Sequence, residues 1–238
     1  LGLIEPVIVV DSNELDIYVD PDDPNSGAIY GNTAGALVNY LSNGALLSRC
    51  YVRGGSISGD TRVGGLVSNV RTGTIDNCYS ATEVSGGRQI GGLAGYSDWG
   101  TITDCHSTSK ITGESIARGL VGGNDGTIQN CHAAGDVTCE STAGGLAGSN
   151  TGTIESSYST ANVTGVCESG GLLGRSHGGK IINCYSSGSV SGGQSAGGLI
   201  GTAKRFNTIA NCCSAGNVVG VESVGGLVGS LNDGTIYN

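Results

Sequence analysis

The chain has 238 residues, a formal net charge of -9 and only 13% charged residues, which is low for a soluble domain. Seven of its 20 acidic residues, and none of its 11 basic residues, lie before residue 49. Because there is no basic stripe and no apolar run of about 18 residues, the composition argues against nucleic-acid binding and a membrane-spanning helix. The chain starts at Leu1 without a signal-peptide pattern, which suggests a processed protein or an excerpt of a larger one.

Residues 1–34 form an acidic extension ahead of the repeats. Two apolar stretches, residues 3–10 and 15–19, predict extended strands that either cap the first coil or complete the last coil of another copy. The extension also offers carboxylate oxygens that could bind Ca²⁺, from Asp16, Asp20, Asp22 and Asp23. Since the cluster matches no EF-hand loop and contains two prolines, a solvated acidic turn is the competing interpretation. No other cofactor is expected.

From residue 35 onward, one pattern recurs with a period of 26 to 28 residues. Each unit has a leucine in a GGLxG-like string, and in most units an isoleucine follows about nine residues later. In most units a cysteine stands three residues further on, and a valine or isoleucine follows six residues beyond it. After a looser copy at Leu37, the leucines are Leu66, Leu93, Leu120, Leu146, Leu172, Leu199 and Leu227. Such a period is typical of a solenoid, in which a unit buries its apolar face only by stacking on its neighbours.

The units are expected to be strands, because the periodic segments are short, rich in Thr, Ile, Val and Tyr, and separated by glycines. Residues three apart, such as Ile75 and Cys78, cannot both face inward on one straight strand, so a bend must lie between them. The residues at this bend tolerate left-handed backbone: Asn77, Asp104, Asn130, Ser156, Asn183 and Asn211. The sequence therefore predicts an all-β fold, a right-handed parallel β-helix (β-solenoid) over residues 35–238, with about seven coils of three short strands each.

The repeat strings resemble a known family. GGLVSNVRTGTIDNCYS from Gly64, GGLAGSNTGTIESSYS from Gly144 and GGLLGRSHGGKIINCYS from Gly170 are similar to the GLUG-motif repeat, named for its glycine-leucine-any-glycine core. The resemblance covers about residues 35–238. Members of this family lie in large bacterial surface proteins, adhesin-like repeats and the non-catalytic part of immunoglobulin-A-cleaving metallopeptidases. The resemblance implies an extracellular setting and assigns no catalytic residue.

Six of the nine cysteines share one position of the repeat: Cys50, Cys78, Cys105, Cys131, Cys184 and Cys212. A zinc site needs ligands that converge tetrahedrally, whereas side chains in one file all point the same way. We therefore expect this cysteine file to fill the core as small apolar groups and to bind no metal. Cys139 and Cys167 lie outside the file in adjacent coils and could form a disulfide if their Cα atoms are close enough. Cys213, next to Cys212, should face solvent.

The residue after each file cysteine is usually aromatic. If the cysteines point inward, a ladder of rings points outward, made of Tyr51, Tyr79, His106, His132, Tyr158 and Tyr185. Such a ladder could bind sugars or another protein, or its members could simply stack on one another as good strand residues. Scattered carboxylates and the lack of a metalloprotease HExxH string argue against an enzyme.

We therefore hypothesise a non-catalytic, extracellular structural or adhesive module of a cell-surface protein. The apolar first strands and the unfinished last coil suggest head-to-tail assembly into a fibre, with other copies or the rest of a larger surface protein as partners. Glycans or host proteins are further candidate partners. The alternative is a β-helix that binds or cleaves carbohydrate with its Tyr/His face.

Overall fold

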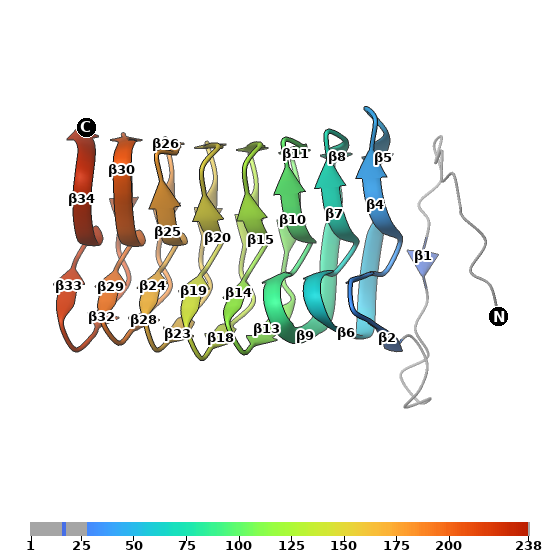
Figure 1. Ribbon diagram of the computed structural model, residues 1–238, viewed down its shortest axis with the longest axis horizontal. Helices are drawn as coiled ribbons and strands as arrows, with labels where there is room; N and C mark the ends of the chain where they lie inside the picture. Colours follow the sequence, from blue (N-terminus) through green and yellow to red (C-terminus); the bar gives the residue numbers. More distant parts are fainter. Residues whose placement is uncertain (1–15, 18–27, 238) are drawn as a thin grey trace.

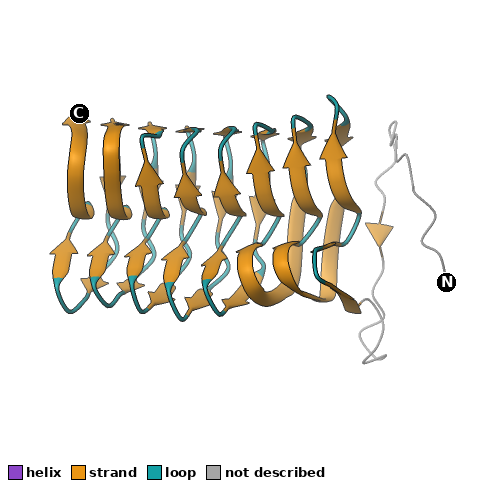
Figure 2. Ribbon diagram, in the orientation of Figure 1, coloured by secondary structure: helices purple, strands orange, loops and turns teal. Residues whose placement is uncertain are grey.

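The computed structural model describes residues 16–17 and 28–237, with side chains from residue 32 onward. Within these residues the chain has no helix and winds into a parallel β-solenoid of about eight turns (Figures 1 and 2). The coils follow one another in sequence order along the long axis of the molecule. The predicted all-β solenoid is confirmed, and the looser repeat at Leu37 adds one coil to the seven expected. No helix in the described ranges has the length and apolarity that a membrane span requires.

A 14-stranded sheet holds the two segments that follow each GGL string. Its first row consists of β4 (Val38–Ser42), β7 (Val67–Arg71), β10 (Ala94–Asp98), β15 (Val121–Asn124), β20 (Ala147–Asn150), β25 (Leu173–His177), β30 (Ile200–Ala210) and β34 (Val228–Tyr237). Its second row consists of β5 (Leu46–Ser48), β8 (Thr74–Asp76), β11 (Thr101–Thr103), β16 (Thr127–Gln129), β21 (Thr153–Glu155) and β26 (Lys180–Ile182), continued by the far halves of β30 and β34.

A 20-stranded sheet holds the rest of each coil in three rows. The row of the aromatic ladder has β1 (Asp16–Ile17), β12 (His106–Ser107), β17 (His132–Ala133), β22 (Tyr158–Ser159), β27 (Tyr185–Ser186) and β31 (Cys213–Ser214). The valine row has β2 (Ala28–Gly31), β13 (Lys110–Gly113), β18 (Val137–Cys139), β23 (Val163–Gly165), β28 (Val190–Ser191) and β32 (Val218–Val219). The last row has β3 (Ala34–Gly35), β14 (Ile116–Arg118), β19 (Thr142–Gly144), β24 (Glu168–Gly170), β29 (Ser195–Gly197) and β33 (Ser223–Gly225), while β6 (Tyr51–Gly64) and β9 (Tyr79–Gly91) span all three.

A central coil thus has five short segments where three were expected, because bends divide the predicted strands. The bend between Ile75 and Cys78 is confirmed, since Asn77 has a φ of 50° in the left-handed region. The same geometry recurs at Asp104, Asn130, Ser156, Asn183 and Asn211, with φ between 49° and 53°. It lets an isoleucine and a cysteine three residues apart both reach the core.

Throughout the core, each residue stacks on the equivalent residue of the next coil. Ile75, Ile102 and Ile128 are paired in register, and the Leu93 N–H donates to the Leu120 carbonyl oxygen at 2.8 Å. The leucine, isoleucine and cysteine files pack into one large cluster, whereas the valine file packs into a second, smaller one. Each coil therefore encloses two hydrophobic clusters, and each file extends parallel to the long axis.

The described part of the N-terminal extension continues this ladder. Strands β1, β2 and β3 all pair in parallel with β6, with Ala28 opposite Ser56 and Ala34 opposite Val63. At the other end, the last coil exposes apolar side chains, with Val224 at 48% and Ile236 at 39% exposure.

Candidate functional site

The six ring-bearing residues of the aromatic ladder form one continuous stack on the 20-stranded sheet. Neighbouring ring centroids are 4.7 to 4.9 Å apart, and neighbouring ring planes differ by 2° to 8°. The stack follows the coils in the order Tyr51, Tyr79, His106, His132, Tyr158, Tyr185. Because the rings lie face to face, neighbours cover the faces of the inner members and only ring edges remain toward solvent.

The exposure of the ladder varies along its length. Tyr51 is 8% exposed and Tyr185 is 41% exposed. The Arg53 guanidinium carbon lies 5.2 Å from the ring centroids of both Tyr51 and Tyr79, which adds cation–π contacts at one end. The ladder therefore stabilises the stacking of coils, and a planar ligand would find the most accessible ring at Tyr185.

The two histidines at the middle of the ladder favour their neutral form. Burial lowers the pKa of both His106 and His132 below the ordinary value of 6.5, and the charge of His106 lowers the pKa of His132 further. Unfolding therefore takes up protons below about pH 6.5, so stability is full above that pH and declines as the pH falls toward the depressed pKa values. The ladder is thus sensitive to mild acid.

We expect the melting temperature of the protein to fall between about pH 7 and about pH 5, measured by circular dichroism. Replacement of both His106 and His132 by tyrosine, the residue of the neighbouring coils, should reduce this slope while keeping the stack. His177, whose pKa burial also lowers, remains in that variant and leaves a residual slope. An unchanged slope in the double variant would contradict a role for the ladder histidines.

The cysteine file lies in the larger core, where all six thiols are free and buried. Its members are linked along the stack, since the N–H of Cys50 donates to Sγ of Cys78 at 3.3 Å and the N–H of Cys78 to Sγ of Cys105 at 3.3 Å. Ser157 replaces the thiol in one coil, and its hydroxyl accepts from the Cys131 N–H at 3.0 Å. Burial, with a smaller effect of Cys78, raises the pKa of Cys50 to about 11. Cys50 is therefore a poor nucleophile and a poor metal ligand. At the other end of the file, the hydrogen bond with the Cys184 thiol lowers the pKa of Cys212 to about 7.

The three remaining cysteines lie outside the file. Cys139 is buried, Cys167 is half-buried, and both are free thiols in the structure. Cys139 lies opposite Gly165, and the Cys167 N–H donates to the Ser141 carbonyl oxygen, so the two cysteines are diagonal neighbours. A disulfide between them stays a prediction. Cys213 is exposed and lies opposite Tyr185 in register.

Metal ligands are not clustered among the described residues, where no three His, Cys, Asp or Glu side chains are placed to hold one ion. The predicted calcium ligands Asp20, Asp22 and Asp23 lie outside the described residues, and Asp16 is described only as part of β1. The calcium hypothesis therefore remains a prediction from the sequence.

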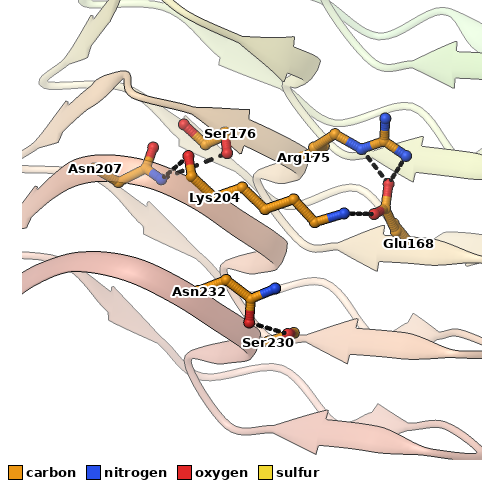
Figure 3. Close-up of polar contacts among 7 residues, drawn as sticks. All are labelled: Glu168, Arg175, Ser176, Lys204, Asn207, Ser230 and Asn232. Atoms are coloured by element: carbon orange, nitrogen blue, oxygen red, sulfur yellow. Dashed lines mark hydrogen bonds and ion pairs between the residues drawn. The ribbon is translucent and has the colours of Figure 1, made fainter.

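A charged cluster joins three coil segments near one end of the solenoid (Figure 3). Glu168 of β24 accepts hydrogen bonds from the Arg175 guanidinium and lies 3.6 Å from Nζ of Lys204. Beside it, Nδ2 of Asn207 donates to the carbonyl oxygen of Lys204 at 2.8 Å. With two cations on its one carboxylate, Glu168 serves to link coils.

Arg118 departs from the repeat, because it lies in register between Gly91 and Gly144, where the motif has glycine. Its side chain is buried, its Nε and Nη1 have no partner, and desolvation lowers its pKa to about 9. The guanidinium fits because residue 148 is a glycine, where a methyl group would overlap Nε of Arg118. This coil therefore buries a charge that the others avoid.

A shallow pocket of about 600 Å³ lies at the bend after the first two strands of the 14-stranded sheet, lined by Tyr40, Ser42, Asn43, Arg71 and Thr72. Trp99, the single tryptophan, is bridged to Arg71 and is 74% exposed. Neither Trp99 nor this pocket was predicted from the sequence. The sequence does contain a signal for it, because a tryptophan directly precedes the bend glycine Gly100. At the equivalent position of two other coils, a threonine precedes the glycine, as in Thr72-Gly73 and Thr151-Gly152.

Comparison with known proteins identifies one family. The GLUG motif matches the chain at residues 86–112, 119–138, 140–164 and 165–191. No curated protein and no solved structure matches the chain. The four matched segments coincide with successive coils of the solenoid, in agreement with the resemblance of the repeat strings. The stacked coils and the four matched segments across residues 86–191 are consistent with a GLUG-repeat family.

Proposed function

We propose that this chain is a non-catalytic, extracellular structural or adhesive module of a cell-surface protein. The observation that carries the proposal is the unbroken parallel register from coil to coil, which the isoleucine file follows from Ile75 to Ile236. Eight coils at about 4.8 Å per step make a rod of roughly 35 Å. A rod with a regular, weakly charged surface suits a spacer that holds other parts away from a cell.

The chemistry of the described side chains supports a non-catalytic role. Glu168 is engaged by two cations, the file thiols are buried, and the ladder rings cover one another's faces. These groups are thus engaged in contacts between neighbouring segments of the solenoid. The GLUG repeats fit an extracellular repeat module.

Head-to-tail association is the finer part of the proposal. In the last described coil, Val224, Leu231 and Ile236 are between 39% and 48% exposed, although their counterparts in earlier coils are buried. These side chains and the backbone groups of β34 match the surface of another coil, because every internal interface of the solenoid uses the same files. A further coil would therefore fit on this end surface, and we propose that it is the first coil of a second copy of this chain.

We expect the purified chain to form concentration-dependent oligomers by light scattering and filaments by electron microscopy. Ile236→Lys should abolish them, because it places a charge on the end surface. Thr235→Lys is the matched control, since Lys180 occupies the same outward file in an earlier coil. A chain that remains monomeric at every concentration, or equal behaviour of both variants, would contradict self-assembly.

The second candidate function is carbohydrate binding or cleavage on the Tyr/His face. The observation in its favour is the row of ring edges, which repeats about every 4.8 Å and ends at the exposed Tyr185. Tyr79→Ala and Tyr185→Ala would test it: loss of glycan binding with the fold intact, shown by circular dichroism, supports this function. Retained binding in both variants excludes it.

A further inference from the structure

The bends that form the pocket and the bend at Trp99 have left-handed backbone, a conformation that recurs at Phe206 in a later coil. Asn43, Thr72 and Trp99 have φ values of 57°, 59° and 61° and stand at the same bend of three successive coils. The Gly44 N–H donates to the Thr72 carbonyl oxygen at 3.2 Å, and the Thr72 N–H to the Asp98 carbonyl oxygen at 3.1 Å. These bonds hold the three bends in register, with Asn43 and Thr72 lining the pocket and Trp99 following one coil further along.

Left-handed backbone is unfavourable for a large aromatic residue, at a cost of order 1–3 kcal/mol. Packing does not offset this backbone cost at Trp99, because the residue is 74% exposed. Tyr40, on the pocket wall, is 54% exposed. Tyr40 thus exposes a ring on the pocket wall, and Trp99 exposes a second ring one coil beyond Arg71 and Thr72 of the same wall.

The polar groups of the pocket complete the chemistry. The pocket wall carries the hydroxyls of Ser42 and Thr72, the amide of Asn43 and the guanidinium of Arg71. Arg71 is oriented by Asp98 at 3.6 Å while its side chain stays 70% exposed, so its donors remain available. An exposed ring beside several hydrogen-bonding groups matches a sugar, which has an apolar C–H face and a rim of hydroxyls.

We propose that this pocket binds a short oligosaccharide, with a sugar ring packed on Trp99 and its hydroxyls bound by Asn43, Arg71 and Thr72. The volume of about 600 Å³ lies within the range of small-ligand sites. A stable protein partner would need about 1,200 Å² of buried surface with an apolar centre, whereas four of the five residues that line this pocket are polar. The inference deepens the adhesive part of the proposed function and rests on it for its ligand class.

Trp99 gives a direct readout, because it is the single tryptophan of the chain. A panel of soluble oligosaccharides, covering glucans, mannans, galactans, chitin fragments and sialylated glycans, is titrated while tryptophan emission and acrylamide quenching are recorded. We expect at least one class to shift the emission and protect Trp99 from the quencher. Arg71→Ala should weaken that binding at least about tenfold. Trp99→Ala should weaken it similarly, measured by calorimetry.

Phe206→Ala is the matched control. Phe206 is an exposed aromatic residue at the equivalent bend of a later coil, with a φ of 47° and 79% exposure, but it lies far from the pocket along the stack. The Phe206→Ala variant should bind the oligosaccharide with the same affinity as the unsubstituted chain. No response to any oligosaccharide, equal loss in Phe206→Ala, or binding to a protein ligand only would overturn the proposal. Light scattering on the same samples reports self-assembly separately, so failure of this site and failure of the proposed rod are distinguishable.

Discussion

Replacement of Gly145 by alanine is expected to destabilise the protein by about 3 kcal/mol or more. A methyl group at Gly145 would overlap the carbonyl oxygen of Gly171 in the next coil and the hydroxyl of Ser159. The same overlap with the next coil recurs at the second glycine of the GGL string in Gly65, Gly92, Gly119, Gly171 and Gly198. The clash is with backbone, which cannot move aside without lengthening the hydrogen bonds of the ladder. Thermal and urea unfolding by circular dichroism measure the effect.

Gly226→Ala is the matched control for this prediction. Gly226 has the same place in the motif, but it lies in the last described coil, and a methyl group there would meet no atom within 4 Å. We expect a change within about 1 kcal/mol. Equal destabilisation by the two substitutions would show that the glycine is needed for its own backbone and not for the approach of the next coil.

Gly148→Ala is expected to destabilise the protein by about 2–3 kcal/mol, because the methyl group would occupy the space of the Arg118 side chain. Arg118 is fully buried and cannot swing into solvent, so its guanidinium must be displaced within the core. Arg118→Gly, which restores the residue of the neighbouring coils, should remove this clash and the buried unpaired donors together. In that background the cost of Gly148→Ala should fall by about 1–3 kcal/mol.

A double-mutant cycle measured by urea unfolding tests this coupling. Gly174→Ala is the control, since Gly174 is the equivalent glycine one coil later and a methyl group there would contact Thr142 and Ala143 instead of Arg118. Its cost should be the same with or without Arg118. If Arg118→Gly changes the effect of both alanine substitutions equally, then Arg118 and Gly148 are not coupled through direct contact.

The periodic sequence was sufficient to predict how the coils stack. Leu93 and Leu120 lie in adjacent coils because a solenoid places each residue over its equivalent one period later. The bend at Asn77 was predictable for the same reason, since the spacing of Ile75 and Cys78 requires it. The ladder from Tyr51 to Tyr185 followed from its place next to the cysteine file.

The tertiary structure alone decided what these files do. The sequence placed rings in a ladder, but only their separation of 4.7 to 4.9 Å shows that the faces are covered, which leaves ring edges as the accessible surface. Likewise, Arg118 and Trp99 break the repeat, and no spacing rule states whether such a side chain enters the core or stands in solvent. Arg118 is buried because Gly148 leaves room, and Trp99 is exposed because a left-handed bend turns it outward. Periodicity determines register, since every coil repeats the same backbone step, whereas the environment of a non-repeated side chain depends on neighbours from other coils.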